Sequence, residues 1–357
     1  AKVFLESLTA SGFKANLLTL EAGENQKNTK TIEIIHDKSF ELKLERGSIM
    51  IALGGNALSP RDEIGTINQQ FSHTRESLNA IMHFVDLGYN ICLTHGNGPQ
   101  VGDELLRMNL THNEIPSLPL GLCVAETQGS IGYMIQQSLQ NALKQKNINR
   151  EVVTLITQTI VDSDDPSIKN PTKFIGQRFS KNEAEKMVKK FGWKIKEQNT
   201  DEWRQVVPSP LPRYIEHGRS IQTLVDKGII VIASGGGGIP ATYDGDGNLE
   251  GLDAVVDKDL SGALLGRVIK SNELWIITDI DQVYLNFGSK NQEPLKEITS
   301  LEARKYQKEG HFQIGTMEPK IKAATYFLKH HGEKVVITSI DRVEEAINGT
   351  NGTIIRN

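Results

Sequence analysis

Cysteine is rare in this sequence, and long apolar runs are absent. The 357 residues include two cysteines, Cys92 and Cys123, and each stands in an apolar context. They cannot supply the disulfide framework of a small secreted domain, so we expect both in the core of a protein from the reducing cytosol. No apolar run approaches the ~20 residues that a membrane-spanning helix requires. We therefore predict a cytoplasmic protein without a membrane partner.

An excess of positive charge is absent too. The chain has 40 Lys and Arg against 44 Asp and Glu, which gives a formal net charge of −4. This balance provides no general attraction to nucleic acids or to anionic membranes. Small molecules are therefore the expected partners, and the length allows one large domain or two of ordinary size.

Several standard motifs are also missing. The P-loop pattern G-x-x-x-x-G-K-[ST] does not occur, and the nearest approach to G-x-G-x-x-G, at Gly96, Gly98 and Gly102, is one residue too long. H-E-x-x-H, C-x-x-C and the protein-kinase motifs H-R-D and D-F-G do not occur either. The histidines do not cluster as metal ligands, and no Ser or Cys nucleophile stands out. We therefore exclude a P-loop enzyme and predict no metal-ligating residues.

Three glycine-rich loops follow strand-like apolar runs. The runs are residues 49–53, 91–94 and 229–233, and the loops are Gly54-Gly55-Asn56, His95-Gly96-Asn97-Gly98 and Ser234-Gly235-Gly236-Gly237-Gly238. Glycine removes the Cβ atom where each strand ends, which leaves backbone amide groups accessible. In an open parallel sheet, ligands bind at the carboxyl ends of the strands, where such amides can hold anions. The three loops together predict a phosphate site.

Strands, glycine loops and helices alternate from Gly47 onward. Further strands are expected at residues 152–157 and 274–278, with a last one at 334–338, and helices at residues 68–87, 103–110, 127–146 and 215–226. Residues 243–248 are expected to form a surface hairpin turn. This alternation predicts an α/β fold in which helices cover both faces of a mainly parallel sheet.

Two segments interrupt the alternation. Residues 1–47 form an appendage of unknown role, in which residues 31–35 and 39–44 alternate like the strands of a hairpin. Residues 162–212 form a more polar insert bracketed by prolines, which predicts a small lid subdomain over the site. The alternatives are an extra edge without chemistry for the appendage and a loop excursion for the insert.

Three lysines stand in positions that suit phosphoryl transfer. Lys173 lies in the insert, Lys258 stands between Asp257 and Asp259, and Lys320 lies at an expected helix start. A phosphoryl transition state carries negative charge on its equatorial oxygens, which backbone amides, lysines and Mg²⁺ stabilise. An arbitrary lysine is nevertheless most often a solvated surface residue. Spacing alone therefore assigns a role to none of the three.

Several longer motifs, taken in their order along the chain, say more about the function than the positions of single lysines. They are Ala52-Leu53-Gly54-Gly55-Asn56-Ala57, residues 95–102, Thr127-Gln128-Gly129-Ser130-Ile131-Gly132-Tyr133, Asn170-Pro171-Thr172-Lys173, residues 206–210, residues 234–240 and Val256-Asp257-Lys258-Asp259. Together they resemble the carbamate kinases, a family with the amino-acid kinase fold. The glycine loops are shared with related kinases of acetylglutamate, aspartate and UMP, whereas residues 95–102, 170–173 and 206–210 are more specific. The resemblance covers the chain from about Ser48 to the C-terminus.

The resemblance implies the reaction carbamoyl phosphate + ADP ⇌ carbamate + ATP, with Mg²⁺ as cofactor, as in fermentative arginine catabolism. Carbamate then decomposes to CO2 and ammonia. The implied fold is a three-layer αβα sandwich with a protruding lid, in which residues 48–233 bind carbamate and carbamoyl phosphate and residues 234–357 bind the nucleotide. A homodimer is implied by the family alone. Because the attacking oxygen of carbamate is already anionic, the reaction needs no general base.

The resemblance also assigns individual residues to the site. Those implied to hold the transferring phosphate and the substrates are Gly54, Gly55, Asn56, Gly96, Asn97, Gly98, Gly235, Gly236 and Gly237. Those implied in catalysis are Lys173 from the lid, Lys258 bridging the phosphates, and Asp257 holding Lys258 in place. Those implied to bind the nucleotide are Lys320, Met317, Asp279 and Tyr284.

The chain departs from the family pattern in its appendage, residues 1–47, and in two motifs. Residues 315–320 read GTMEPK where carbamate kinases commonly have Gly-Ser-Met-Pro-Lys, and Asp279 replaces the glycine of a Thr-Gly-Val-Asp motif. One alternative is a related kinase with another small carboxylate acceptor, which the insert motifs disfavour. The other is a catalytically silent nucleotide-binding regulatory protein, which the retained lysines disfavour. We expect His95 to fix its loop by hydrogen bonds rather than to act as an acid or base.

Overall fold

An eight-stranded sheet lies at the centre of the unit formed by residues 47–357. The computed structural model of the protein describes residues 31, 47–55, 65–313 and 315–357. In spatial order the strands are β15 (Glu297–Thr299), β17 (Thr353–Arg356), β16 (Lys334–Ser339), β12 (Glu273–Thr278), β1 (Ser48–Leu53), β2 (Asn90–His95), β9 (Ile230–Ile232) and β3 (Val152–Thr154). Neighbouring strands are parallel except for β16 and β17. The sheet is therefore mainly parallel, as predicted.

Side chains alternate between the two faces of this sheet. In β1, Ile49 and Ile51 belong to one buried apolar cluster and Met50 belongs to another. All three are fully buried. Because both faces of the strand are covered, its sequence is a continuous apolar run without polar residues at alternate positions.

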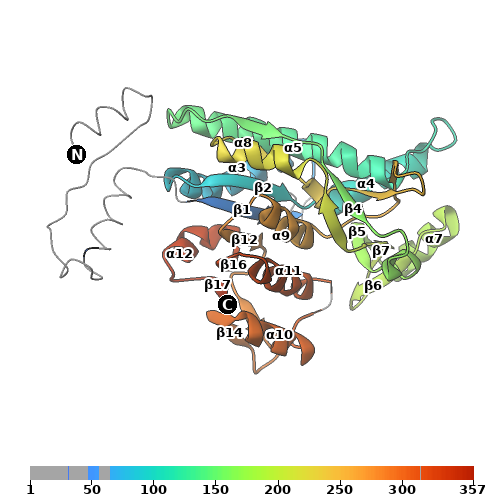
Figure 1. Ribbon diagram of the computed structural model, residues 1–357. Coiled ribbons are helices and arrows are strands. Elements are labelled where there is room, and N and C mark those ends of the chain that lie inside the picture. Colours follow the sequence, from blue (N-terminus) through green and yellow to red (C-terminus); the bar gives the residue numbers. More distant parts are fainter. Residues whose placement is uncertain (1–30, 32–46, 56–64, 314) are drawn as a thin grey trace. The chain divides into compact units, whose positions relative to one another are not determined.

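Helices cover both faces of the sheet. Those packed in the cluster of Ile49 are α3 (Ile67–Asp86), α5 (Leu120–Gln145) and α12 (Val343–Ile347), and those packed in the cluster of Met50 are α8 (Gly218–Asp226), α9 (Lys258–Val268) and α11 (Met317–Lys329). Figure 1 shows α5 and α11 on opposite sides of β1 and β2. This arrangement confirms the predicted three-layer αβα fold.

The predicted insert emerges from a second sheet. This sheet contains, in order, β11 (Leu249–Gly251), β10 (Ile239–Tyr243), β4 (Gln158–Val161) and β8 (Pro212–Ile215). Residues 244–248 join β10 to β11, which confirms the predicted hairpin turn. Since β4 and β8 pair antiparallel, the chain leaves this sheet at Val161 and returns at Pro212. Residues 162–212 are thus an excursion whose two ends lie side by side.

The excursion has a sheet and a small core of its own. Its elements are α6 (Pro166–Lys169), β5 (Lys173–Phe179), α7 (Lys181–Phe191), β6 (Ile195–Asn199) and β7 (Glu202–Val207), with the strands in the order β5-β7-β6. Trp193 is buried against Phe179 and Phe191. The tryptophan therefore belongs to the core of the excursion.

The remaining described elements complete the unit. They are α4 (Gly98–Thr111), the 3-10 turns η3 (Gly235–Gly237) and η4 (Ile340–Arg342), β13 (Val283–Leu285), β14 (Glu293–Leu295) and α10 (Ser300–Lys308). No helix of the described part of the chain is long and apolar enough to cross a membrane. The hairpin predicted at residues 31–35 and 39–44 lies outside the described residues, apart from Thr31.

Some predicted boundaries were wrong. Helix α5 begins at Leu120 and not at residue 127, because Leu120 and Val124 pack with Val207 in a third apolar cluster. The strand predicted at residues 152–157 ends at Thr154, and the chain continues into β4 of the other sheet. Helix α8 begins at residue 218 and not at residue 215, because Ile215 is the last residue of β8 and pairs with Thr159 of β4. In each case a partner distant in sequence decides the boundary.

The strand predicted to be last is not the last one. Strand β17 follows β16 and lies between β16 and β15 in the sheet. Its four residues are too few to show a clear apolar period. Pairing on both sides makes this segment a strand.

Candidate active site

Most of the site residues predicted from the sequence border one cleft of about 870 Å³. Those that line it are Gly54, Gly55, Gly96, Asn97, Gly98, Lys173, Gly236, Asp257, Lys258, Asp279, Tyr284, Met317 and Lys320. Gly235 and Gly237 are buried and do not border the cleft. Asn56 lies outside the described residues. The structure therefore brings together residues that are up to 266 positions apart in the chain, from Gly54 to Lys320.

The first two glycine loops touch each other at the ends of adjacent strands. Strands β1 and β2 pair in parallel with Leu53 opposite His95, so both loops leave the sheet at the same edge. A Cβ atom on Gly96 would lie 2.8 Å from the backbone nitrogen of Gly55, which is closer than any side chain permits. Helix α4 begins at Gly98 with Asn97 as its N-cap, and no side chain caps it. The amide groups of this helix end can therefore face an anion in the cleft.

The third glycine loop supports the second one. A Cβ atom on Gly235 would lie 2.3 Å from Nε2 of His95, and one on Gly236 would lie 2.2 Å from Nδ2 of Asn97. Gly236 also has a φ of +64°, which disfavours any larger residue. The Asn97 side chain donates a hydrogen bond to Oγ1 of Thr127 at 2.9 Å. These glycines are needed for close packing behind the cleft as well as for accessible backbone.

His95 is a buried residue between the second and third loops. Its Nδ1 atom lies 3.1 Å from the carbonyl oxygen of Gly96, and the side chain is nearly inaccessible to solvent. Burial lowers the pKa of His95 to about 4, because the charged form loses hydration and Lys258 repels it. The neutral ring is therefore the form present at neutral pH, consistent with the predicted role in fixing the loop.

We expect His95 to make the protein less stable as the pH falls. Its folded-state pKa of about 4 lies below the ordinary value of 6.5, so the unfolded chain binds the proton first. Stability should be complete above pH 6.5 and fall between pH 6.5 and 4, by about 3 kcal/mol from this group. Urea unfolding at several pH values measures the loss. His95→Gln should flatten this dependence, whereas substitution of the exposed His112 by Gln should leave it unchanged.

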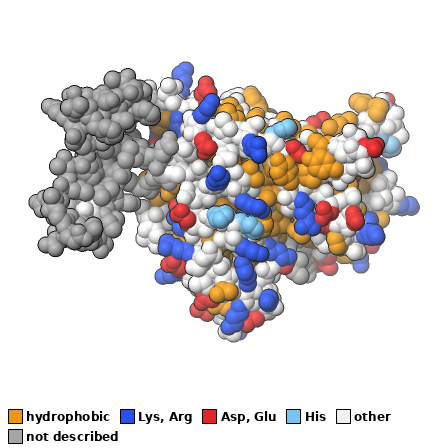
Figure 2. All heavy atoms as spheres, viewed as in Figure 1, with side chains coloured by type: hydrophobic (Ala, Val, Ile, Leu, Met, Phe, Trp, Pro, Cys, Tyr) orange, Lys and Arg blue, Asp and Glu red, His pale blue; other side chains and the backbone are white. Residues whose placement is uncertain are grey.

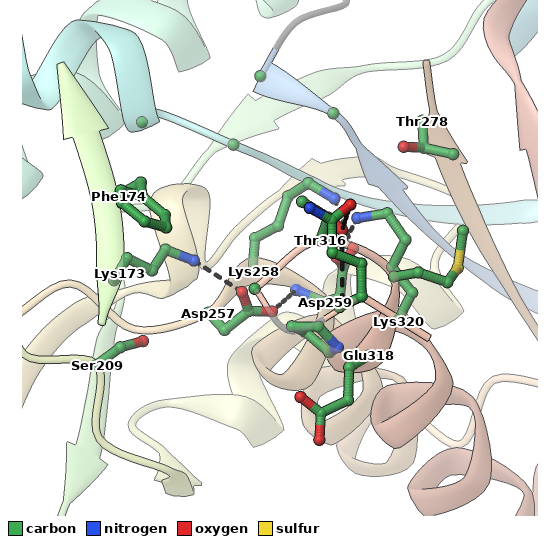
Figure 3. A pocket seen from close by; sticks show the side chains of 18 of the residues that line it. Lys173, Phe174, Ser209, Asp257, Lys258, Asp259, Thr278, Thr316, Glu318 and Lys320 are labelled. Carbon is green, nitrogen blue, oxygen red and sulfur yellow. Dashed lines mark hydrogen bonds and ion pairs between the residues drawn. The ribbon is translucent and has the colours of Figure 1, made fainter. Parts of the chain in front are cut away.

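A cluster of charged side chains lines the same cleft (Figure 3). Lys173 Nζ lies 2.7 Å from Oδ2 of Asp257, while Lys258 Nζ and Lys320 Nζ lie 2.5 and 3.0 Å from the two carboxylate oxygens of Asp259. Lys173 comes from β5, Asp257 to Asp259 from the start of α9, and Lys320 from the first turn of α11. The three ammonium groups exceed the two carboxylates, so the cluster carries a net positive charge.

Two of the lysines occupy positions that a helix does not favour. Lys258 is the first residue of α9, and Lys320 lies in the first turn of α11. The N-terminal end of a helix carries partial positive charge, which repels a cation. Asp257 satisfies the start of α9 by accepting hydrogen bonds from the backbone nitrogens of Asp259 at 2.9 Å and Leu260 at 3.3 Å. Two positive helix ends and their lysines thus converge where an anion would be stabilised.

The pKa values show how strongly these groups depend on one another. Burial opposes ionisation of Asp257 and Asp259, but the adjacent lysines outweigh it and lower both pKa values. Burial lowers the pKa of Lys258, and Asp259 offsets only part of this. Burial also disfavours charged Lys320, but Asp259 and Asp257 outweigh it and raise its pKa. Both carboxylates are therefore ionised at neutral pH.

Another part of the cleft is lined by aromatic residues. Tyr284 and Phe287 have ring centroids 5.9 Å apart, and the Tyr284 hydroxyl donates to Oδ1 of Asp281 at 2.9 Å. Asp279 accepts a hydrogen bond from Oγ1 of Thr278 at 3.0 Å, and its charge contributes to the raised pKa of Lys320. An apolar wall beside cationic groups suits a nucleotide, whose base is flat and whose phosphates are anionic.

Sequence reasoning missed several residues of the cleft. The resemblance implied that Asp257 holds Lys258 in place, but Asp257 instead pairs with Lys173 and accepts hydrogen bonds from the start of α9. The carboxylate that pairs with Lys258 is that of Asp259, which was noted from the sequence only as a neighbour of this lysine. The excursion of residues 162–212 also contributes Arg178, Lys196 and Arg204 to the lining. No sequence signal identifies these three, because the direction of a side chain on a short strand depends on the folded lid.

Comparisons with known proteins agree with this geometry. The sequence model of the amino acid kinase family matches residues 47–339. The carbamate kinase of Pyrococcus horikoshii is 43% identical over 307 residues, which cover 85% of this chain and 98% of that protein. The carbamate kinase of Staphylococcus haemolyticus is 41% identical over 311 residues, covering 86% and 99%.

Solved structures give the same result. The carbamate kinase of Giardia lamblia bound to citric acid has a TM-score of 0.83 and 37% identity, covering 87% of this chain and 98% of that one. The same enzyme bound to AMP-PNP has a TM-score of 0.78 at 37% identity, with the same coverage. The chain therefore belongs to the amino acid kinase family, and within it to the carbamate kinases.

Proposed function

We propose that this protein catalyses the reversible transfer of a phosphoryl group from carbamoyl phosphate to ADP, which yields ATP and carbamate. The observation that carries the proposal is the convergence of Lys173, Lys258 and Lys320 with the first two glycine loops at one cleft. The similarity to carbamate kinases over 85% of the chain supports the same reaction. It is a phosphotransferase with a carboxyl-group acceptor.

The chemistry requires little besides charge and position. In the direction that consumes ATP, an oxygen of carbamate that is already anionic attacks the γ-phosphorus and ADP leaves, so no group has to remove a proton. His95 is buried and does not border the cleft, which is consistent with a site that has no general base. Two anions must instead be brought together against their repulsion, which the positively charged cluster reduces.

Each part of the cleft has a proposed role. Gly54 and Gly55 hold the transferring phosphoryl group through their backbone, and residues 96–98 hold the carbamoyl end. Lys173 approaches from the lid, and Lys258 and Lys320 contact the phosphates. Asp259 accepts hydrogen bonds from both of the latter and so keeps their ammonium groups close together. Residues 48–233 thus carry the carbamate side of the site.

The nucleotide is proposed to bind to residues 234–357. Tyr284 and Met317 would contact its base or ribose, and Lys320 its phosphates. The complex of the Giardia enzyme with AMP-PNP supports a nucleotide site in this fold. Asp279 places a carboxylate here where the family commonly has glycine, so it is a candidate for contact with the ribose hydroxyls.

Mg²⁺ is proposed to enter with the nucleotide. The described residues include no group of three His, Cys, Asp or Glu that could hold a metal ion. A site without such a group still fits Mg²⁺, because this ion keeps several waters and is commonly bound by substrate phosphates with one or two carboxylates. When bound, the ion would neutralise charge on the phosphates, which together with waters would supply most of its ligands.

A direct assay tests the reaction. Purified protein, carbamoyl phosphate, ADP and Mg²⁺ are expected to form ATP, measured by a coupled luminescent reaction. Absence of ATP, together with phosphorylation of acetylglutamate or aspartate from ATP, would support a related kinase instead. If nucleotide binds without turnover of any of these acceptors, the protein is a silent nucleotide-binding protein.

We also propose a cytoplasmic homodimer. Figure 2 shows apolar side chains gathered on one area of the surface, and Tyr214 of β8 and Tyr243 of β10 are each about half exposed. A contiguous apolar area is commonly covered in the functional protein. Sedimentation equilibrium should give twice the mass of the chain, and a monomer at micromolar concentration would contradict the proposal. Cell fractionation should recover the protein in the cytoplasmic fraction, which tests the proposed location.

A further inference from the structure

Helix α4 connects the second glycine loop to the excursion of residues 162–212, which is the predicted lid. The helix begins at Gly98 in the cleft, and Gly102 lies one turn later, about 6 Å further along the helix axis. At Gly102 the helix meets Gly176 of the lid strand β5. A Cβ atom on Gly102 would lie 2.0 Å from Cα and 2.3 Å from the backbone nitrogen of Gly176. Since both atoms belong to the backbone, no side-chain rotation could relieve the clash.

The lid strand is adapted to this contact. Gly176 has a φ of +66°, and the pairing of β5 with β7 shifts register between Ile175 and Arg178. Such an irregularity bends a strand and redirects its side chains. Ile175 is fully buried with Val101 in the third apolar cluster. The strand is therefore fixed to α4 at the point where it bends.

Polar contacts also hold β5 in place, one from α4 and one from β7. Gln177 Nε2 donates to Oδ1 of Asp103 at 3.1 Å, and Arg204 Nη2 donates to the carbonyl oxygen of Gly176 at 2.8 Å. Lys173 stands at the start of β5, three residues before Gly176, and its ammonium group reaches Asp257. A displacement of β5 at Gly176 would therefore move Lys173 out of the cleft.

We propose that Gly102 is a positioning residue for Lys173. The absence of a side chain at Gly102 lets β5 lie directly on α4. This contact fixes the position of Lys173, at the start of β5, relative to the second glycine loop, at the start of α4. The sequence contains Gly102 as the last glycine of residues 95–102, and the site described above leaves it without a role. The proposal rests on the proposed function, because it assigns Lys173 to the reaction.

The substitution Gly102→Ala tests the proposal. It adds one methyl group that must push β5 away from α4, and kcat should fall at least tenfold while KM for ADP changes less than twofold. Gly129→Ala is the matched control, since Gly129 lies within α5 and a Cβ atom there meets nothing within 4 Å. Its kinetic constants should equal those of the wild type.

A double-mutant cycle separates positioning of Lys173 from a general effect on folding. In the background of Lys173→Ala, Gly102→Ala should lower kcat less than twofold further, because the group it displaces is already missing. A further loss of tenfold or more would overturn the proposal. Gln177→Ala provides a second test if Gly102→Ala fails to fold. It should lower kcat two- to fivefold, and this loss should also vanish in the Lys173→Ala background.

Tryptophan fluorescence gives a readout that does not need turnover. Gly102, Gly176 and Trp193 border the same small cavity in the lid. Displacement of β5 should expose Trp193 and shift the emission of Gly102→Ala to longer wavelength, with no shift in Gly129→Ala. If the wild type forms no ATP, the proposed function fails while this measurement still tests the contact. An unshifted emission together with unchanged kcat would overturn the inference alone.

Discussion

Substitution of Lys173 by Ala is expected to lower turnover by about 10²–10³-fold, the usual cost of removing one preorganised group from a charged transition state. Lys173 is the lid residue of the cluster, and its side chain is 22% exposed in its ion pair with Asp257. Strand β5 holds this charge at the cleft, where it can stabilise the phosphoryl group during transfer. The loss should therefore appear in kcat, since the interaction belongs mainly to the transition state.

The same substitution should change stability little. The Lys173–Asp257 pair is partly exposed to solvent, and such pairs contribute about 1 kcal/mol or less. Thermal unfolding measures this, and steady-state ATP formation measures turnover. Lys189→Ala is the matched control, because Lys189 is an exposed lysine of the same lid. Turnover within twofold of the wild type in Lys173→Ala would refute the lid assignment.

Substitution of Asp259 by Asn is expected to reduce both stability and turnover. Asp259 is almost fully buried and pairs with Lys258 and Lys320, so the variant would retain two cations without their carboxylate. Removing one partner of a buried ion pair costs about 3–5 kcal/mol. Turnover should fall about 10²-fold or more, because the two ammonium groups repel each other and no longer lie together at the phosphates.

An anion should partly replace the missing carboxylate. Without Asp259 the cluster would carry more positive charge at two helix ends, so inorganic phosphate should raise the melting temperature of Asp259→Asn more than that of the wild type. Glu309→Gln is the control, since Glu309 forms an exposed pair with Lys305 at 4.0 Å and should behave like the wild type. Wild-type stability and turnover in Asp259→Asn would show that the cluster does not depend on this residue.

The sequence predicted the layers of the fold because its central strands are buried on both faces. In β1 every residue from Ile49 to Leu53 is apolar and buried, a pattern that is evident without knowledge of the partner strands. The boundaries that were wrong depended on such partners. Strand β17 exists because it pairs with β15 and β16, and α5 begins early because Leu120 packs against Val207. Local propensity cannot predict contacts of this kind.

For the site, the sequence by itself determined which residues could bind an anion. The glycines at strand ends were identified from their chemistry, whereas the lysines at 173, 258 and 320 were assigned only through the resemblance to the carbamate kinases. Only the tertiary structure decided that Asp259 pairs with two lysines and that Gly102 lies against Gly176. Both contacts join segments far apart in the chain, and their distances depend on how helices and lid pack, which no local pattern encodes.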